Sequence, residues 1–120
     1  MLMIKEVAFV AVAVSDFARA KKFYEETLEL KVSSAPEGFP WAEFEVGAVT
    51  IGVGQHSAWQ PSRDGTTIAF EVDDIDAAIV KLKERGVSFD MDKIETPVCW
   101  MAQFRDPDGN KLLVHKRKSA

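Results

Sequence analysis

The stretch AFVAVAVSDFARAKKFY, from Ala8 to Tyr24, is repeated in plan by TIAFEVDDIDAAIVKLK, from Thr67 to Lys83. Each stretch reads as an alternating apolar strand that ends on a valine, a polar residue and an aspartate, and then passes directly into an amphipathic helix. When Asp16 is superposed on Asp74, the apolar residues on both sides of the aspartates also coincide. An internal repeat of this kind predicts a fold built from two similar modules.

The first repeat begins a module of one strand, one helix and three further strands. Ile4 to Val14 predicts a strand whose valines face the helices, and Ser15 or Asp16 can cap the helix that follows. The three short strands expected next lie at Lys31 to Ser34, Trp41 to Val46 and Ala48 to Gly54. They complete the first half of the fold.

The second half follows the same plan after a connection, Gln55 to Gly65, that is rich in turn-forming residues. A strand is expected at Thr67 to Val72, then a helix capped by Asp73 or Asp74 that ends at Gly86. The remaining strands are expected at Val87 to Phe89, Val98 to Phe104 and Lys111 to His115. The whole chain is therefore two copies of a β-α-β-β-β unit.

Length and composition predict one globular domain over residues 1–120, with modules at about 1–56 and 65–117. The 120 residues are 47% hydrophobic and 28% charged, which is ordinary for a chain with a full core. A net charge of −4 argues against a nucleic-acid partner, and the first residues lack the pattern of a signal peptide. The lone Cys99 has no partner for an internal disulfide. We therefore expect a cytoplasmic protein with no membrane span.

The turn DPDGN, from Asp106 to Asn110, joins the last two expected strands. Proline presets the second turn position and Gly109 tolerates a positive φ, so the segment predicts a hairpin. Together with VSDFARAKKFYEETLEL and IAFEVDDIDAAIVKLKERGV, the closing DPDGNKLLVHKRK resembles the vicinal oxygen chelate superfamily. That superfamily includes glyoxalase I, bleomycin-resistance proteins, fosfomycin-resistance enzymes and extradiol dioxygenases.

The resemblance implies an α+β fold. In it, two βαβββ modules form a curved, cup-like mixed β-sheet with helices on the convex face. A second copy of the chain often completes the fold, so a homodimer is expected. The sequence departs from the family pattern at Glu29, which stands where a glycine commonly follows the leucine of the first helix.

The resemblance also implies where an enzyme of this kind would hold a divalent metal, with His or Glu ligands on the concave face. The matching positions in this chain are Phe9, Thr67, the Thr50 to Gly52 region and Leu113. None of them offers an imidazole or a carboxylate, and the hydroxyl of Thr67 is a poor substitute. We therefore expect no metal ligands and no other cofactor, and we assign no catalytic residue.

The other polar residues that could take part in chemistry also have plain structural roles. His115 at the rim of the cup is more often a surface residue, and His56 reads as a solvated loop residue. Glu43 and Glu45 share one strand face, and exposure at the rim explains them without chemistry. Glu71 can act with His115 in metal binding or proton transfer only if the two meet in the fold.

The expected cup is apolar and aromatic, and it suits a flat organic ligand. Cys99 is read as a pocket-lining residue, because no base stands at a spacing that would activate a nucleophile. The three tryptophans can each serve in the core, at a dimer interface or in the cup. The predicted lining residues are Phe9, Trp41, Thr67, Glu71, Cys99, Trp100, Met101, Gln103, Leu113 and His115.

Three functions are compatible with the sequence. The first is a metal-free protein that binds an unidentified small organic molecule, similar in mode to bleomycin-resistance proteins. The second is a metal-dependent lyase or dioxygenase of the glyoxalase type that uses displaced ligands such as Glu71 and His115. The third is a structural or regulatory homodimer whose cup is filled by its own side chains. Elemental analysis of the purified protein separates the first two.

Overall fold

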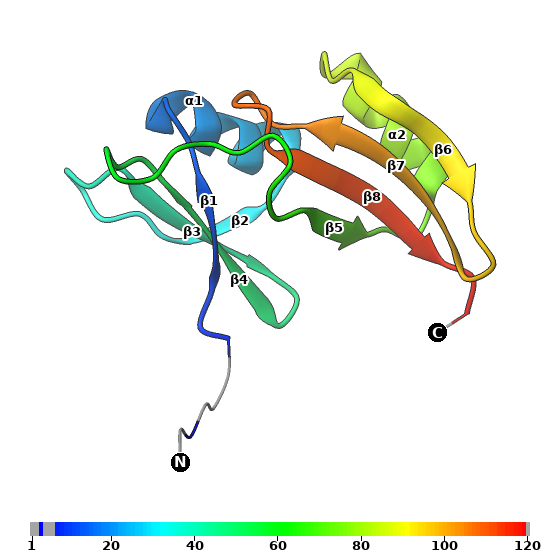
Figure 1. Cartoon of the computed structure of the whole chain (residues 1–120), viewed down its shortest axis with the longest axis horizontal. Helices are drawn as coiled ribbons and strands as arrows, with labels where there is room; N and C mark the ends of the chain where they lie inside the picture. Colours follow the sequence, from blue (N-terminus) through cyan, green and yellow to red (C-terminus); the bar gives the residue numbers. More distant parts are fainter. Residues whose placement is uncertain (1–2, 4–6, 120) are drawn as a thin grey trace. The chain divides into compact units, whose positions relative to one another are not determined.

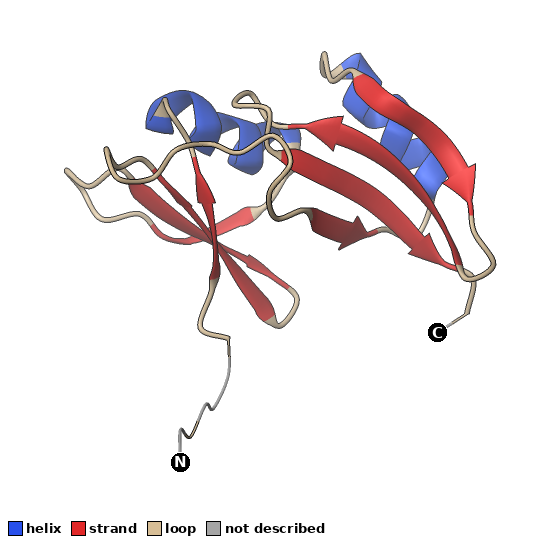
Figure 2. Ribbon diagram, in the orientation of Figure 1, coloured by secondary structure: helices blue, strands red, loops and turns tan. Residues whose placement is uncertain are grey.

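Two four-stranded mixed sheets form the fold, one in each of two compact units (Figure 1). The computed structural model describes residue 3 and residues 7–119. The units are Met1–Gln60 and Pro61–Ala120, so the boundary lies inside the predicted connection. The α+β class and the order of strand, helix and three strands are confirmed in each unit (Figure 2).

The first unit holds a sheet in the order β1-β4-β3-β2, in which β1 is parallel to β4 and the other pairs are antiparallel. Its elements are β1 (Val10–Ala13), α1 (Phe17–Lys22), the π-helical turn η1 (Phe23–Thr27), β2 (Lys31–Ser34), β3 (Trp41–Val46) and β4 (Val49–Gly54). Over the described residues the register with β4 runs from Val10 to Ala13, so the first strand is shorter there than predicted. Residues 4–6 of that prediction lie outside the described part of the chain.

The core of the first unit lies between its sheet and its helix. Val12 and Val14 are buried while Ala11 is exposed, which confirms the predicted alternation of the first strand. Tyr24 from η1 is fully buried, and its ring lies 6.0 Å from that of Phe44 on β3. The helix therefore covers the sheet face that carries Phe44, and the opposite face is turned away from it.

The helix of the first unit begins and ends at residues that the sequence singles out. Asp16 caps it by accepting a hydrogen bond from the amide of Arg19 at 3.1 Å. At the other end the amide of Leu28 donates to the carbonyl of Phe23, a five-residue step that widens the last turn. Glu29 then adopts a φ of 59°, in the left-handed region that favours glycine.

Glu29→Gly is expected to raise the free energy of unfolding by about 0.5–1 kcal/mol. A left-handed conformation costs a non-glycine residue about 1–2 kcal/mol, and the extra freedom of glycine in the unfolded chain offsets part of the gain. Urea denaturation measures the change. The matched control is Glu26→Gly, which lies within η1 and should destabilise the protein by about 1 kcal/mol. Destabilisation by both changes would contradict the assignment of strain to Glu29.

The second unit repeats the plan with a sheet in the order β5-β8-β7-β6. Its elements are β5 (Ile68–Glu71), α2 (Ile75–Glu84), β6 (Phe89–Glu95), β7 (Cys99–Arg105) and β8 (Lys111–Arg117). Helix α2 packs against β7 and β8, and Figure 1 shows it behind the sheet. The buried residues of the sheet on this side are Ala102, Phe104, Leu112 and Val114.

Local signals set the ends of α2 and the last hairpin as predicted. Asp74 caps the helix through the amide of Ala77 at 3.0 Å, and Gly86 follows it with a φ of 87°. In the DPDGN turn Gly109 has a φ of 85°. The buried carboxylate of Asp106 accepts hydrogen bonds from the amides of Asp108 and Asn110, so the turn is fixed from within.

The prediction for the first strand after α2 is wrong in position. It was expected at Val87 to Phe89, whereas β6 begins at Phe89 and continues to Glu95. Apolar and polar residues alternate from Phe89 to Asp92, but the alternation breaks at Lys93, and β6 pairs with β7 through two register shifts. An edge strand with such irregularities is held by its neighbour more than by its own pattern.

Within the described part of the chain each sheet has two edge strands: β1 and β2 in the first unit, and β5 and β6 in the second. The predicted homodimer, the cup and the convex placement of the helices stay predictions.

Among the described residues, no helix combines the length and apolar character that crossing a bilayer requires.

Candidate functional site

The sheet face of the first unit that is turned away from its helix carries a tryptophan lying over two glycines. We call this the far face of the first sheet. Trp41 on β3 lies over Gly52 and Gly54 of β4. A Cβ atom at Gly52 would come within 2.3 Å of the indole ring, and one at Gly54 within 2.5 Å. The two glycines therefore make room for the ring.

Two further aromatic rings contact Trp41 and form what we call the aromatic cluster: Phe9, Trp41 and Trp59. The ring centres of Phe9 and Trp59 lie 5.3 and 6.0 Å from that of Trp41, and both meet it edge to face. Phe9 is 45% exposed and Trp59 is 46% exposed. Large aromatic side chains that stay half exposed leave apolar surface available to a ligand.

Trp59 belongs to the loop that follows β4, and hydrogen bonds of this loop hold it in the aromatic cluster. The amide of Trp59 donates to the carbonyl of His56 at 2.9 Å, and the ring of His56 lies 5.5 Å from the Trp59 indole. The side chain of Gln55 accepts a hydrogen bond from the amide of Phe17 at 2.9 Å, which ties the start of the loop to α1. The sequence predicts His56 to be a solvated loop residue, and Trp59 is not among the predicted lining residues.

Two carboxylates flank the aromatic cluster along β3. The indole N–H of Trp41 donates to Glu43 at 3.0 Å, so the ring is anchored at its polar edge. Glu45 lies two residues further along β3 on the same face, and it accepts a hydrogen bond from the hydroxyl of Thr50 at 2.9 Å. The far face of the first sheet is thus an aromatic surface with fixed acidic groups beside it.

The far face of the second sheet, turned away from α2, carries polar groups among apolar ones. Strand alternation and register place Ala69, Glu71, Met101, Gln103, Arg105, Lys111, Leu113 and His115 on it. Glu71 and His115 do meet: imidazole Nδ1 lies 2.6 Å from carboxylate Oε1. The sequence named both residues but carried no sign that the fold would pair them.

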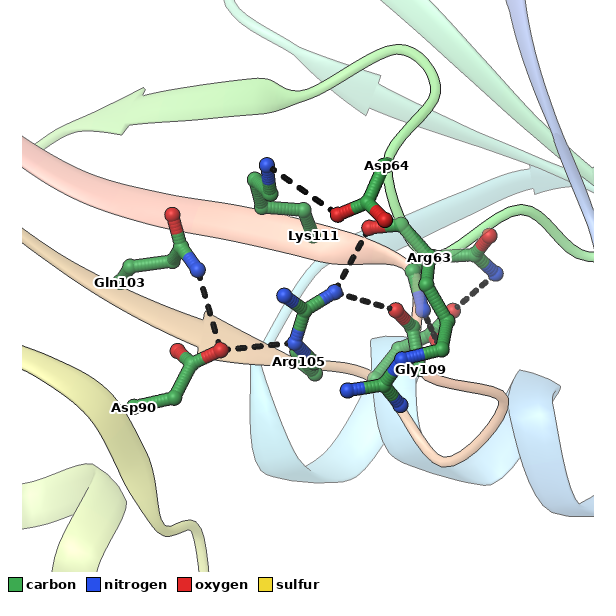
Figure 3. A network of polar contacts seen from close by, with 9 residues as sticks. Arg63, Asp64, Asp90, Gln103, Arg105, Gly109 and Lys111 are labelled. Carbon is green, nitrogen blue, oxygen red and sulfur yellow. Dashed lines mark hydrogen bonds and ion pairs between the residues drawn. The ribbon is translucent and has the colours of Figure 1, made fainter.

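A hydrogen-bond network fixes the other end of this face, next to the DPDGN turn (Figure 3). Asp90 Oδ2 accepts from Gln103 at 3.0 Å and from the guanidinium of Arg105 at 2.7 Å. Arg105 also donates to the carbonyls of Arg63 and Gly109, at 2.6 and 2.9 Å. The amide of Gln103 is therefore held in one orientation, and Arg105 ties three segments of the unit together.

The positions that the resemblance assigns to a metal do not fit one. Phe9 contacts Trp41, the Gly52 position lies under the indole, and the Thr50 hydroxyl is bonded to Glu45. Leu113 has no donor atom. Among residue 3 and residues 7–119, no three His, Cys, Asp or Glu side chains are grouped so that they could hold a metal ion. The donor sets on both far faces therefore support no metal centre.

The remaining predicted lining residues fall at different places in the second unit. Trp100 shares strand parity with the buried Ala102, which puts it on the opposite face of β7 from Met101 and Gln103. Its ring lies under the ammonium group of Lys118 at 5.0 Å. Cys99 is buried, with its sulfur 3.1 Å from the hydroxyl of Thr96. Thr67 precedes β5 and is partly buried.

The family model described as the Glyoxalase/Bleomycin resistance protein/Dioxygenase superfamily matches residues 6–114. Among curated proteins, the "Uncharacterized protein YetH" of Bacillus subtilis (strain 168) is 32% identical over 119 residues, covering 93% of this chain and 98% of that protein. The match extends across both units, so it concerns the whole fold.

Solved structures with a similar fold agree with this family match. TnmS3, described as an antibiotic binding protein from Streptomyces sp. CB03234, has a TM-score of 0.82 and 27% identity, over 98% of this chain and 100% of that one. A member of the Glyoxalase/bleomycin resistance protein/dioxygenase superfamily from Sphaerobacter thermophilus DSM 20745 has a TM-score of 0.79 and 28% identity, over 96% and 99%. The resemblance drawn from the sequence is confirmed.

Proposed function

Since the chain belongs to the Glyoxalase/Bleomycin resistance protein/Dioxygenase superfamily, we propose that it is a small-molecule-binding protein whose ligand stacks on the aromatic cluster. The observation that carries the proposal is the half exposure of Phe9 and Trp59 beside the anchored ring of Trp41. Aromatic rings held in place on a rigid sheet bind a flat ligand at little entropic cost.

The side chains around the aromatic cluster support a binding function. The far face of the first sheet offers apolar rings and two carboxylates that are already bonded to Trp41 and Thr50. The similarity to TnmS3, which is described as an antibiotic binding protein, also supports binding of an organic molecule. Fold similarity alone leaves the chemistry open, so the proposal rests on the aromatic cluster.

A matched pair of probes tests the proposal. We expect 2-naphthalenemethanol, which is flat, to bind several times more tightly than its saturated and puckered decahydro analogue. Trp59→Ala or Phe9→Ala should each weaken binding of the flat probe by about tenfold, because an aromatic contact contributes about 0.5–1.5 kcal/mol beyond its buried area. Isothermal titration calorimetry measures both affinities.

Trp100→Ala is the matched control, since it removes the same side chain from a different surface. It should leave the affinity for 2-naphthalenemethanol unchanged. Equal binding of the two probes would refute stacking as the mode of recognition. An equal loss in Trp59→Ala and Trp100→Ala would move the site away from the aromatic cluster.

A further inference from the structure

The pair formed by Glu71 and His115 is a second feature of the molecule, separate from the aromatic cluster. Strands β5 and β8 run parallel and place these two residues side by side, although 44 positions separate them in the chain. Glu71 Oε1 bonds imidazole Nδ1 at 2.6 Å, and Oε2 accepts the backbone amide of Arg117 at 2.8 Å. Both carboxylate oxygens are therefore engaged, and the carboxylate is fixed in orientation.

The carboxylate of Glu71 is held in its ionised form. The hydrogen bond from the Arg117 amide and then that from His115 lower its pKa below the ordinary value, and they outweigh the opposing effect of desolvation. An ionised carboxylate only accepts hydrogen bonds, so Nδ1 of the imidazole must carry the proton between them. In the neutral ring the lone pair then lies on Nε2.

The surroundings of His115 suit an organic ligand. Its side chain is 22% exposed, and its nearest register partner on β7 is the apolar Met101. Leu113 lies two positions earlier on the same face of β8. Glu71 from β5 brings a negative charge to the ring, and the guanidinium of Arg117 from β8 lies 3.9 Å from Glu71 Oε1. The ring thus combines an oriented acceptor with apolar neighbours.

We propose that Nε2 of His115 accepts, and then removes, the proton of an acidic hydroxyl in a small organic ligand such as a phenol or an enol. The O–H bond of the ligand breaks, its electron pair stays on oxygen, and an N–H bond forms on Nε2. Glu71 is the positioning residue, because its negative charge stabilises the imidazolium that results. The structure assigns this role to the second unit, independently of stacking on the aromatic cluster.

A chromogenic phenol tests the proposal on the full chain. The probe is 4-nitrophenol, whose deprotonated form absorbs at longer wavelength, and the control probe is its methyl ether 4-nitroanisole, which has no proton to give. At a pH below the midpoint of the free probe, adding protein should produce the phenolate band. The ether should bind at least about fivefold more weakly, because it leaves the acceptor unpaired.

Variants assign the effect to individual atoms. His115→Phe should abolish the phenolate band, whereas Glu71→Gln, which keeps an acceptor but loses the charge, should reduce it. If His115→Phe fails to fold, His115→Asn serves in its place with the same expectation. The nitrogen resonances of His115 give a second readout: on binding, Nε2 should move from the position of an unprotonated imidazole nitrogen to that of a protonated one.

Two outcomes would overturn the proposal. One is a phenolate band that persists in His115→Phe or His115→Asn. The other is a band that is lost in Trp59→Ala and kept in the His115 variants, which would assign the phenol to the aromatic cluster. Neither outcome bears on stacking of the naphthyl probe, because 2-naphthalenemethanol has no acidic hydroxyl. Failure of this inference and failure of the proposed function are therefore distinguishable.

Discussion

Gly52→Ala is expected to destabilise the protein by about 1–3 kcal/mol and to abolish binding of 2-naphthalenemethanol. The new Cβ atom would lie 2.3 and 2.4 Å from two carbon atoms of the Trp41 indole, which no packed structure tolerates. The ring cannot simply lift away, because Glu43 holds its N–H and the rings of Phe9 and Trp59 contact it. Overpacking of this kind forces strained side chains and has this order of cost.

A double-mutant cycle with Trp41→Ala isolates the clash. Without the indole, Gly52→Ala meets no ring, and the gain of a side chain in a strand should make it neutral or stabilising by up to about 1 kcal/mol. The cost of Gly52→Ala should therefore disappear or reverse in the Trp41→Ala background. Chemical denaturation of the four proteins measures it, followed by circular dichroism so that loss of a tryptophan does not alter the signal. An equal cost in both backgrounds would show that Gly52 is needed for another reason.

Much of the fold could be predicted because its signals are local. Asp16 and Asp74 cap their helices through amides three residues ahead, and glycine at 109 adopts the positive φ that its turn requires. The strand Trp41 to Val46 has the predicted bounds, since its alternation is regular. β6 was misplaced because its position depends on pairing with β7, and single-sequence patterns do not carry such pairing.

The candidate site was less predictable, since its contacts are not local. Glu71 meets His115 only because β5 and β8 adopt one parallel register, and a shift of one residue would separate them. Trp59 lies in a loop whose conformation depends on its own hydrogen bonds. One signal for this site is present in the sequence. Gly52 and Gly54 alternate within a strand, and such a pair indicates that something large lies across its face.

Arg105→Ala is expected to lower the free energy of unfolding by about 2–3 kcal/mol. The side chain is 19% exposed and donates to Asp90 and to the carbonyls of Arg63 and Gly109 (Figure 3). Truncation leaves all three acceptors without this donor, and bonds to charged groups contribute about 1.5–3 kcal/mol each before partial solvation compensates. Arg105→Lys should recover less than half, because one ammonium group cannot span the same acceptors.

Lys111→Ala is the matched control within the same network. Its ammonium group lies 3.8 Å from Asp64, whose side chain is 85% exposed, so the pair is largely solvated. Removing it should change stability by less than about 0.5 kcal/mol. Urea denaturation of the variants provides the comparison. If Lys111→Ala proves as costly as Arg105→Ala, general charge balance and not the geometry of Arg105 would explain the loss.

The cost of Arg105→Ala should also depend on pH. Partial desolvation acts to raise the pKa of Asp90, but hydrogen bonds from Arg105 and Gln103 outweigh it and hold the pKa below its ordinary value of 3.8. A lowered pKa stabilises the folded state above the ordinary value, and this stabilisation disappears as the pH falls through the folded pKa. The difference between wild type and Arg105→Ala should therefore be smaller at about pH 3 than at neutral pH. The bonds to the two carbonyls do not titrate, so part of the stability difference should persist in acid. A stability difference that stayed constant with pH would show that these carbonyls, and not Asp90, account for the whole effect.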